Sequence, residues 1–215
     1  MDRSVIDAKM IDRCIALSAE AAQHGELPYG CVICCGGKVV AEATNRVVRD
    51  GDVTRHAEIL AISAAQRSLG RSDLADCTIY SNVEPCAMCA FPIRETRIGR
   101  VVYAISSPMM GGLSKWNVLG DDELADAMPV VFGDRPEVAA GLHYRDAAAV
   151  WRKWNPAIWL GIRLRGCLAE PDTDDAVVTL QGRAPARHPL TAMLWRGVAR
   201  LLARVLEGKR EAPTG

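Results

Sequence analysis

The chain has 215 residues, of which 49% are hydrophobic and 24% charged, and this composition excludes an intrinsically disordered protein. No apolar run is long enough to cross a bilayer, so a cytoplasmic protein is expected. The net charge of zero hides a split, because residues 183–215 carry seven Arg and Lys against two Glu, which leaves 19 basic and 24 acidic residues, a net −5, for residues 1–182. Proteins that hold a phosphate backbone are normally basic, so an acidic domain argues against a nucleic-acid substrate such as tRNA.

The first predicted elements are a helix and a β-hairpin. Apolar residues recur at helical spacing over residues 10–24, and Gly25 follows as a stop. Residues 29–35 and 38–44 are rich in small and β-branched side chains, and the glycine pair between them favours a tight turn. A helix followed by two antiparallel strands is therefore expected.

The middle of the chain alternates helices and strands. Residues 54–69 have helical periodicity, with Thr54 as a predicted N-cap, and residues 76–82 form a predicted buried strand. Pro85 suits the first position of a further helix, because its missing N–H costs nothing there. Further along, the pattern predicts strands over residues 99–106 and 128–133 and a helix over residues 135–154.

This alternation favours an α/β fold, a three-layer α/β/α sandwich in which a mixed five-stranded sheet has helices on both faces. The predicted domain covers residues 1–165, and an irregular segment punctuated by Pro and Gly, residues 166–182, is read as a linker.

The last predicted segment is a basic amphipathic helical arm over residues 183–215. Arg196, Arg200 and Arg204 recur every four residues, with apolar side chains toward the other side. The arm either docks on its own acidic domain or across a dimer, which we favour, or contacts anionic lipid or a partner.

Two short motifs carry the chemistry: "HAE" at residues 56–58 and "PCAMC" at residues 85–89. Cys86 and Cys89 lie three residues apart at a predicted helix start, so their sulfurs share one face, and the helix N-terminus favours thiolates. With His56 they form a set of three nitrogen and sulfur ligands typical of Zn²⁺, leaving one position open as catalytic zinc sites do. Glu58 is then placed to act as general acid and base without binding the metal.

A second Cys-x-x-Cys pair, Cys31 and Cys34, falls within a predicted strand. Successive strand residues point to opposite faces, and these two thiols are three positions apart, so they are expected in the core and not at a shared metal.

The two motifs together closely resemble those of the cytidine deaminase-like superfamily, in particular the branch of tRNA adenosine deaminases, guanine deaminases and cytosine deaminases. The resemblance covers about residues 8–160. It implies His56, Cys86 and Cys89 as ligands of one Zn²⁺ per subunit, Glu58 as the proton shuttle, and a homodimer. It also implies that Asn45 and the backbone N–H of Ala57 bind the substrate.

The loop over residues 105–127 departs from the pattern of the tRNA-acting members, and Trp116 within it is a candidate for lining the substrate pocket or for packing. The predicted function is hydrolytic deamination of a nucleobase-like ring with release of ammonia, and a small substrate such as guanine, cytosine or a related base or nucleoside is favoured. The alternatives are deamination of adenosine in tRNA and a zinc-stabilised binding module without catalytic activity.

Overall fold

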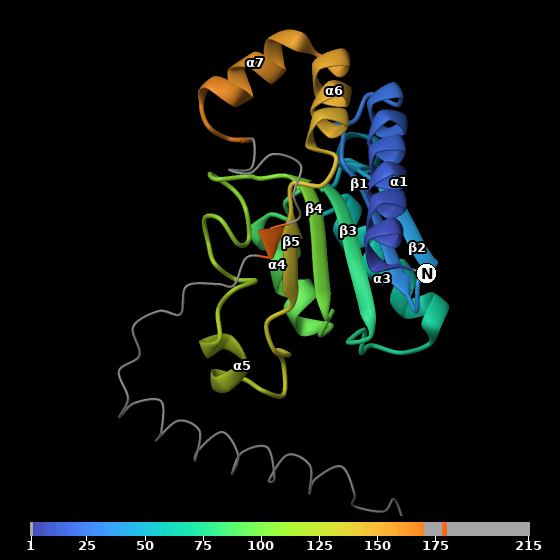
Figure 1. Ribbon diagram of the computed structural model, residues 1–215, viewed down its shortest axis with the longest axis vertical. Helices are drawn as coiled ribbons and strands as arrows, with labels where there is room; N and C mark the ends of the chain where they lie inside the picture. Colours follow the sequence, from blue (N-terminus) through green and yellow to red (C-terminus); the bar gives the residue numbers. More distant parts are fainter. Residues whose placement is uncertain (1, 170–177, 180–215) are drawn as a thin grey trace, which may run out of the picture.

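The computed structural model describes residues 2–169 and 178–179. The elements in chain order are α1 (Arg3–Gln23), β1 (Gly30–Cys35), β2 (Lys38–Thr44), α2 (Val47–Asp50), α3 (Ala57–Leu69), β3 (Cys77–Val83), α4 (Ala87–Glu95), β4 (Arg100–Ile105), α5 (Glu123–Ala127), β5 (Glu137–Ala140), α6 (Tyr144–Trp154), α7 (Pro156–Leu164) and β6 (Val178–Thr179) (Figure 1). Most of the linker predicted over residues 166–182 and all of the arm predicted over residues 183–215 lie outside the described residues.

The strands form one mixed sheet in the order β2-β1-β3-β4-β5-β6. The central strands β3, β4 and β5 are parallel, whereas β1 is antiparallel to both β2 and β3. The predicted mixed five-stranded sheet is confirmed by β1 to β5, and β6 adds two residues antiparallel to β5.

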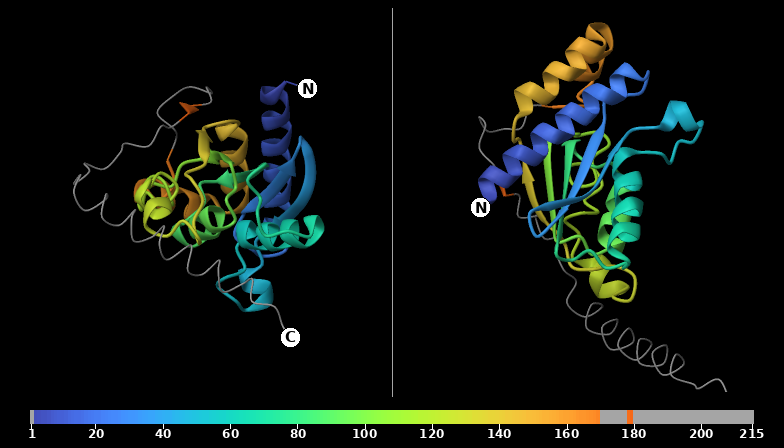
Figure 2. Two further views of the ribbon diagram at one scale, coloured as in Figure 1. Left: turned by 90° about the horizontal axis from the view of Figure 1, so that it is seen from below. Right: turned by 90° about the vertical axis from the view of Figure 1, so that its right-hand side faces the viewer.

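Helices cover both faces of this sheet, as predicted, with α1 and α6 on one face and α3 and α4 on the other (Figure 2). Each face has its own apolar core, and β1 contributes to both. Cys31 packs in the α3 and α4 core, and Cys34 in the α1 and α6 core. The prediction that these two thiols face opposite sides is confirmed.

The hairpin between β1 and β2 turns on Gly36 and Gly37, whose φ angles are +55° and +76°. Both values lie in the left-handed region, which a type I′ turn requires at both central positions and which glycine adopts without strain. The predicted hairpin is confirmed. By contrast, the first helix begins earlier than residue 10, because Asp2 caps it by accepting a hydrogen bond from Ser4 N at 3.3 Å.

Two predicted elements after β4 are wrong. Residues 128–133 form turns instead of a strand, and the segment predicted as one helix over residues 135–154 divides into β5 and α6. Gly141, with a φ of +95°, separates them. Four residues are too short for an alternating pattern to reveal a strand, and β5 forms because β4 offers an edge to pair with.

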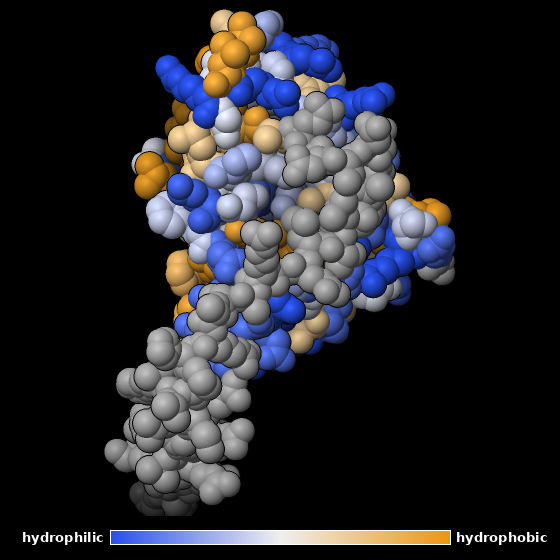
Figure 3. Space-filling model, turned by 60° about the vertical axis from the view of Figure 1, so that its left-hand side comes forward, coloured by the Kyte–Doolittle hydropathy of each residue, from blue (hydrophilic) through white to orange (hydrophobic). Residues whose placement is uncertain are grey.

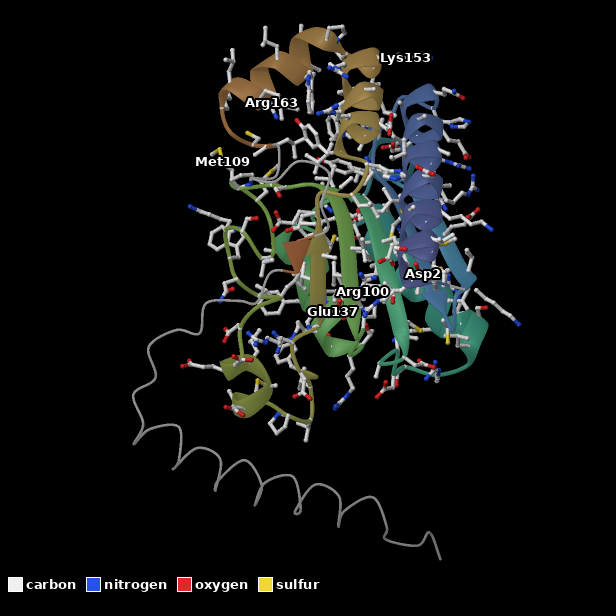
Figure 4. All side chains as sticks on the ribbon, in the orientation of Figure 1. Asp2, Arg100, Met109, Glu137, Lys153 and Arg163 are labelled. Carbon is white, nitrogen blue, oxygen red and sulfur yellow. The ribbon has the colours of Figure 1, made fainter. Side chains whose placement is uncertain are left out.

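A buried ion pair ties α1 to the sheet. Both oxygens of Asp7 accept hydrogen bonds from the Arg100 guanidinium, at 2.7 and 2.8 Å, and Tyr80 donates to the same carboxylate at 2.8 Å. Arg100 also bonds Glu137 on β5, and the two residues lie close together in Figure 4. Among the described residues, no helix combines the length and the apolar character that crossing a membrane requires.

Candidate active site

The two sequence motifs meet where α3 and α4 begin. His56 occupies the N-cap position of α3 and Cys86 that of α4, while Glu58 and Cys89 lie in the first turns of these helices. Thr54, the predicted cap, therefore lies two residues before the actual one. Pro85 likewise precedes the cap of α4 instead of opening the helix. Both helices begin about two residues later than predicted. His56 with Glu58, and Cys86 with Cys89, still lie at the starts of the two predicted helices.

Three donor atoms converge between these helix ends. His56 Nδ1 lies 3.5 Å from each of the Cys86 and Cys89 sulfurs, and the sulfurs lie 3.7 Å apart. Tetrahedral zinc at its usual bond lengths separates two sulfurs by about 3.8 Å and a nitrogen from a sulfur by about 3.6 Å. The spacing and the chemistry of the donor set both fit a zinc ion.

The surroundings of Cys86 favour the thiolate form, which is the form that binds a metal. The hydrogen bond from Cys89, together with His56, lowers the pKa of Cys86 to about 4, although burial opposes the shift. The same interaction with Cys86, together with burial, raises the pKa of Cys89, so Cys86 is the thiol that ionises more readily. A divalent cation at this position would hold both sulfurs as thiolates, because a metal binds the deprotonated form.

Glu58 is buried beside the donor set. Its Oε1 accepts a hydrogen bond from Ser81 of β3 at 3.0 Å, and its Oε2 lies 3.6 Å from the Cys89 sulfur. Burial raises the pKa of the Glu58 carboxyl. The carboxyl is thus held in one orientation and can carry a proton closer to neutral pH than an exposed glutamate would.

A second buried carboxylate, which sequence reasoning missed, fixes the loop beside the site. Glu84, just before Pro85, accepts hydrogen bonds from the backbone N–H groups of Ser107, Leu113 and Ser114 at 2.7, 3.0 and 2.7 Å, and from Ser114 Oγ at 2.6 Å. A Cβ on Gly111 would lie 2.1 Å from Glu84 Oε1, so only glycine fits. The indication that the sequence offers for this role of Glu84 is a single charged residue directly after an apolar strand.

Asn45 and Ala57 both lie near the His56 end of the site. Asn45 is buried and donates a hydrogen bond to the buried carboxylate of Glu26 at 2.9 Å. The backbone bond from Arg46 N to Arg55 O, 3.0 Å, brings the residue after Asn45 next to the residue before His56. Ala57 is the first residue of α3, so its N–H precedes the helix's own hydrogen bonds.

Trp116 is largely exposed, whereas Asn45 and Ala57 are buried. Its side chain is 60% exposed, on the loop that Glu84 holds, and its backbone N–H bonds to Gly111 O at 3.1 Å. The described residues do not enclose it in a pocket.

A basic and aromatic pocket of about 330 Å³ lies between α6 and α7. Arg163 lies over the Trp159 ring, 5.8 Å from its centroid, and donates to Tyr144 Oη at 2.6 Å, while Arg145 and Arg152 complete the positive lining. None of these three arginines forms an ion pair with a carboxylate in the part of the chain that the structure describes. Hydrophobic and strongly hydrophilic side chains lie next to one another at this end of the molecule (Figure 3).

This pocket lies at the same edge of the sheet as the zinc-type donor set. The helices α4 and α6 follow the parallel strands β3 and β5, so both begin at the carboxyl ends of the strands. The segment after α7 also contacts the loop beside the site, because the Cys167 sulfur lies 3.8 Å from Met109 Sδ and Ser107 Oγ donates to Cys167 O at 3.1 Å.

Comparison with known proteins identifies a family model and several relatives. The family model for the cytidine and deoxycytidylate deaminase zinc-binding region matches residues 4–105. The tRNA-specific adenosine deaminase of Aquifex aeolicus is 36% identical over 105 residues, which are 48% of this chain and 70% of the relative. The tRNA(Ile)-lysidine synthase of Deinococcus deserti is 36% identical over 139 residues, 64% of this chain. This chain spans 25% of the length of that synthase.

Two solved structures extend the likeness to the fold. A structure from a study of A-to-I editing by tRNA:A34 deaminases is 30% identical, covers 66% of this chain and 98% of its own, and has a TM-score of 0.58. The guanine deaminase of Nitrosomonas europaea is 26% identical, covers 69% of this chain and 84% of its own, and has a TM-score of 0.53.

Proposed function

The chain belongs to the cytidine and deoxycytidylate deaminase family, and on that premise we propose that it hydrolyses an exocyclic amino group on a nucleobase-like ring and releases ammonia. His56, Cys86 and Cys89 hold one Zn²⁺ per subunit in this proposal. The observation that carries it is the spacing of the three donor atoms, 3.5 to 3.7 Å, next to the buried Glu58 carboxyl.

The proposed mechanism divides the chemistry between metal and carboxyl. Zinc, when bound, lowers the pKa of a water molecule and so supplies a nucleophile near neutral pH. Glu58 accepts one proton of that water and passes it to the ring nitrogen. It then takes the remaining proton of the hydroxyl added to the ring and gives it to the departing amine, so that the carbon–nitrogen bond breaks, ammonia leaves and a carbonyl remains. Ser81 supports this shuttle by holding one carboxyl oxygen while the other remains available.

The substrate is held by groups around His56 in this proposal. The Asn45 amide, whose orientation the Glu26 carboxylate sets, offers hydrogen bonds to the base. The Ala57 backbone N–H at the start of α3 offers a further donor. Trp116 would cover the base only if the exposed loop turned inward or a second subunit packed on it.

The decisive experiment replaces the proton shuttle and measures metal and turnover separately. Glu58→Gln should keep one zinc per chain and the folded state but lose measurable ammonia release. Glu42→Gln, which changes an exposed carboxylate paired with Arg13, is the matched control and should keep full turnover. Retained turnover in Glu58→Gln would refute the assignment, and a zinc-loaded wild type without turnover on any substrate would favour a binding module.

Two substrate classes remain, and the first is a free base or nucleoside, favoured by the acidic charge of residues 1–182. Ammonia release should be compared on guanine, cytosine, adenine, their nucleosides and tRNA. Release from a base or nucleoside at rates above that from tRNA would support this class.

The second class is adenosine in tRNA, and the α6 and α7 pocket is the observation that favours it. Its three arginines lie at the sheet edge that carries the donor set, where a phosphate backbone could lie while one base enters the site. Replacing Arg145 and Arg152 by Gln should weaken tRNA binding and reduce its salt dependence while leaving turnover of a free base unchanged. Unchanged tRNA affinity would remove this support.

We also propose that the chain forms a homodimer through the exposed apolar side of α4. Met88 and Phe91 on this helix are 37% and 43% exposed, and Phe91 lies against Phe132 with ring centroids 6.0 Å apart. Sedimentation at micromolar concentration should show a dimer, and replacing Phe91 by Asp should dissociate it. A wild-type monomer would refute the proposal.

A further inference from the structure

Two cysteines outside the zinc-type site lie opposite one another on neighbouring strands. Cys35 is the last residue of β1 and Cys77 the first residue of β3, and they are direct partners in the antiparallel pairing. Residues directly opposite in a sheet point their side chains to the same face. The two sulfurs and a carboxylate oxygen of Asp76 all lie within 4.8 Å of one another.

The backbone makes Cys35 and Cys77 a non-hydrogen-bonded pair, the kind of antiparallel pair in which the two Cα atoms lie closer together. Cys35 is paired with Lys38 across the two-glycine turn, so its backbone N–H and C=O point toward β2 and away from β3. The Cys77 N–H is also directed elsewhere, because it donates to Leu74 O at 2.9 Å. A pair without mutual hydrogen bonds has Cα atoms about 4.5 Å apart, within the range of about 4.4 to 6.8 Å that a disulfide spans.

The surroundings give the two thiols different roles. Cys35 is partly exposed, its thiol donates a hydrogen bond to Asp76 Oδ2 at 3.3 Å, and Arg71 Nη2 lies 3.8 Å from its sulfur. Cys77 is buried, and burial together with Cys35 and Asp76 raises its pKa to about 12. Its sulfur lies 3.7 Å from Asp76 Oδ1, and Arg71 pairs with the same carboxylate. Cys35 is thus the accessible nucleophile, and Cys77 is the buried thiol directly opposite it.

We propose that Cys35 and Cys77 are a reactive thiol pair that closes to a disulfide by exchange with a small-molecule disulfide such as oxidised glutathione. The Cys35 thiolate attacks one glutathione sulfur, the sulfur–sulfur bond breaks, and the first glutathione leaves and takes up the proton that Cys35 gave to solvent. The Cys77 sulfur then attacks the Cys35 sulfur of the mixed disulfide, the second glutathione leaves as a thiolate, and it takes up the proton that Cys77 loses. Two protein thiols are oxidised, and one disulfide is reduced to two thiols.

This pair is independent of the proposed deaminase site. Cys77 begins β3, whereas Glu84 and Cys86 follow the opposite end of that strand. A disulfide between β1 and β3 should therefore raise the melting temperature by restricting the unfolded chain, while zinc content and turnover stay unchanged.

The test uses the zinc-loaded full chain and oxidised glutathione, with thiols counted after denaturation and linked peptides identified by mass spectrometry. The wild type should lose two thiols and yield a peptide pair joined through Cys35 and Cys77. Cys77→Ser should stop at a glutathione adduct on Cys35, and Cys35→Ser should leave Cys77 unmodified. Cys167→Ser, which removes another partly exposed thiol, should still form the Cys35–Cys77 link.

Three results would overturn the proposal. The first is a wild type that retains a glutathione adduct on Cys35, because Cys77 would then not resolve it. The second is disulfide formation by another pair with loss of zinc. The third is a second zinc or cadmium ion per chain that Cys77→Ser abolishes without any disulfide forming, which would assign the cluster with Asp76 to metal binding instead.

Discussion

The carboxylate of Glu84 should be the most sensitive support of the site, and Glu84→Gln tests this without changing side-chain size. The wild-type carboxylate accepts four hydrogen bonds, two on each oxygen, from residues of the loop beside the site. An amide has only one acceptor oxygen. If that oxygen keeps the Leu113 and Ser114 N–H groups, the amide nitrogen meets the Ser107 N–H, donor against donor.

The cost can be estimated from these bonds. One unpaired buried N–H costs about 1–3 kcal/mol, and replacing a charged acceptor by a neutral one costs about 1 kcal/mol for each of the two bonds that stay on the oxygen. The Ser114 hydroxyl loses its charged acceptor at a similar cost, because it must turn to accept from the amide nitrogen. These terms share one side chain and do not add fully, so the expected loss in the free energy of unfolding is about 3–5 kcal/mol. Because the loop neighbours the site, turnover should fall as well.

Urea unfolding of the zinc-loaded protein measures the loss, with zinc per chain and ammonia release determined on the same samples. Zinc should stay bound at low denaturant, since all three proposed ligands are unchanged. The control Glu42→Gln breaks an exposed ion pair with Arg13, so it should cost less than about 1 kcal/mol. A Glu84→Gln protein within about 0.5 kcal/mol of wild type would refute the idea that this carboxylate holds the loop.

Three further changes should act away from the site. Asp7→Asn leaves the buried Arg100 guanidinium with Glu137 as its remaining ionic partner and should cost up to about 3–5 kcal/mol in urea unfolding; a loss under 1 kcal/mol would mean that the Asp7 pair is not needed. Gly30→Ala places a methyl carbon 2.4 Å from a backbone oxygen of α1, so the melting temperature should fall, and an unchanged value would contradict the close packing of α1 on β1. The hydrogen bond from Arg13 lowers the pKa of Glu42, so the pair stabilises the protein above the carboxyl's ordinary pKa of 4.5 and the gain is lost as pH falls through the lowered value. Arg13→Gln should therefore be less stable than wild type near pH 7 and equal to it at low pH, and an equal difference at both would contradict the linkage.

The site could be predicted from sequence because its geometry is local. His56 with Glu58, and Cys86 with Cys89, are each fixed by one helix start, so two short spacings determine most of the arrangement. What the sequence did not show was how the two helix ends meet, and this depends on the antiparallel pairing of β3 with β1 in the sheet. A pattern that depends on one turn of helix can be read without knowing the rest of the fold.

The supports of the site could not be predicted, because their partners are distant in sequence. Glu84 bonds residues 23 to 30 positions away, and the fully buried Arg94 donates to the carbonyl oxygens of Val118, Asp121 and Gly133. A charged residue in sequence is normally read as exposed. The loop segments over residues 107–133 supply the carbonyl and N–H groups that allow Glu84 and Arg94 to be buried.

The same limit applies to the inference from net charge. Residues 144–165 carry five Arg and Lys against one Asp, a net +4, so the −5 of residues 1–182 divides into this basic helix pair and −9 elsewhere. Charges act over about 8 Å at physiological ionic strength, which is far less than the extent of a domain. A phosphate group near Trp159 would meet the arginines of α6 and α7 and not the average of the chain. The acidic total therefore weakens the case for tRNA less than its size suggests, and the local arrangement of charge must decide the substrate class.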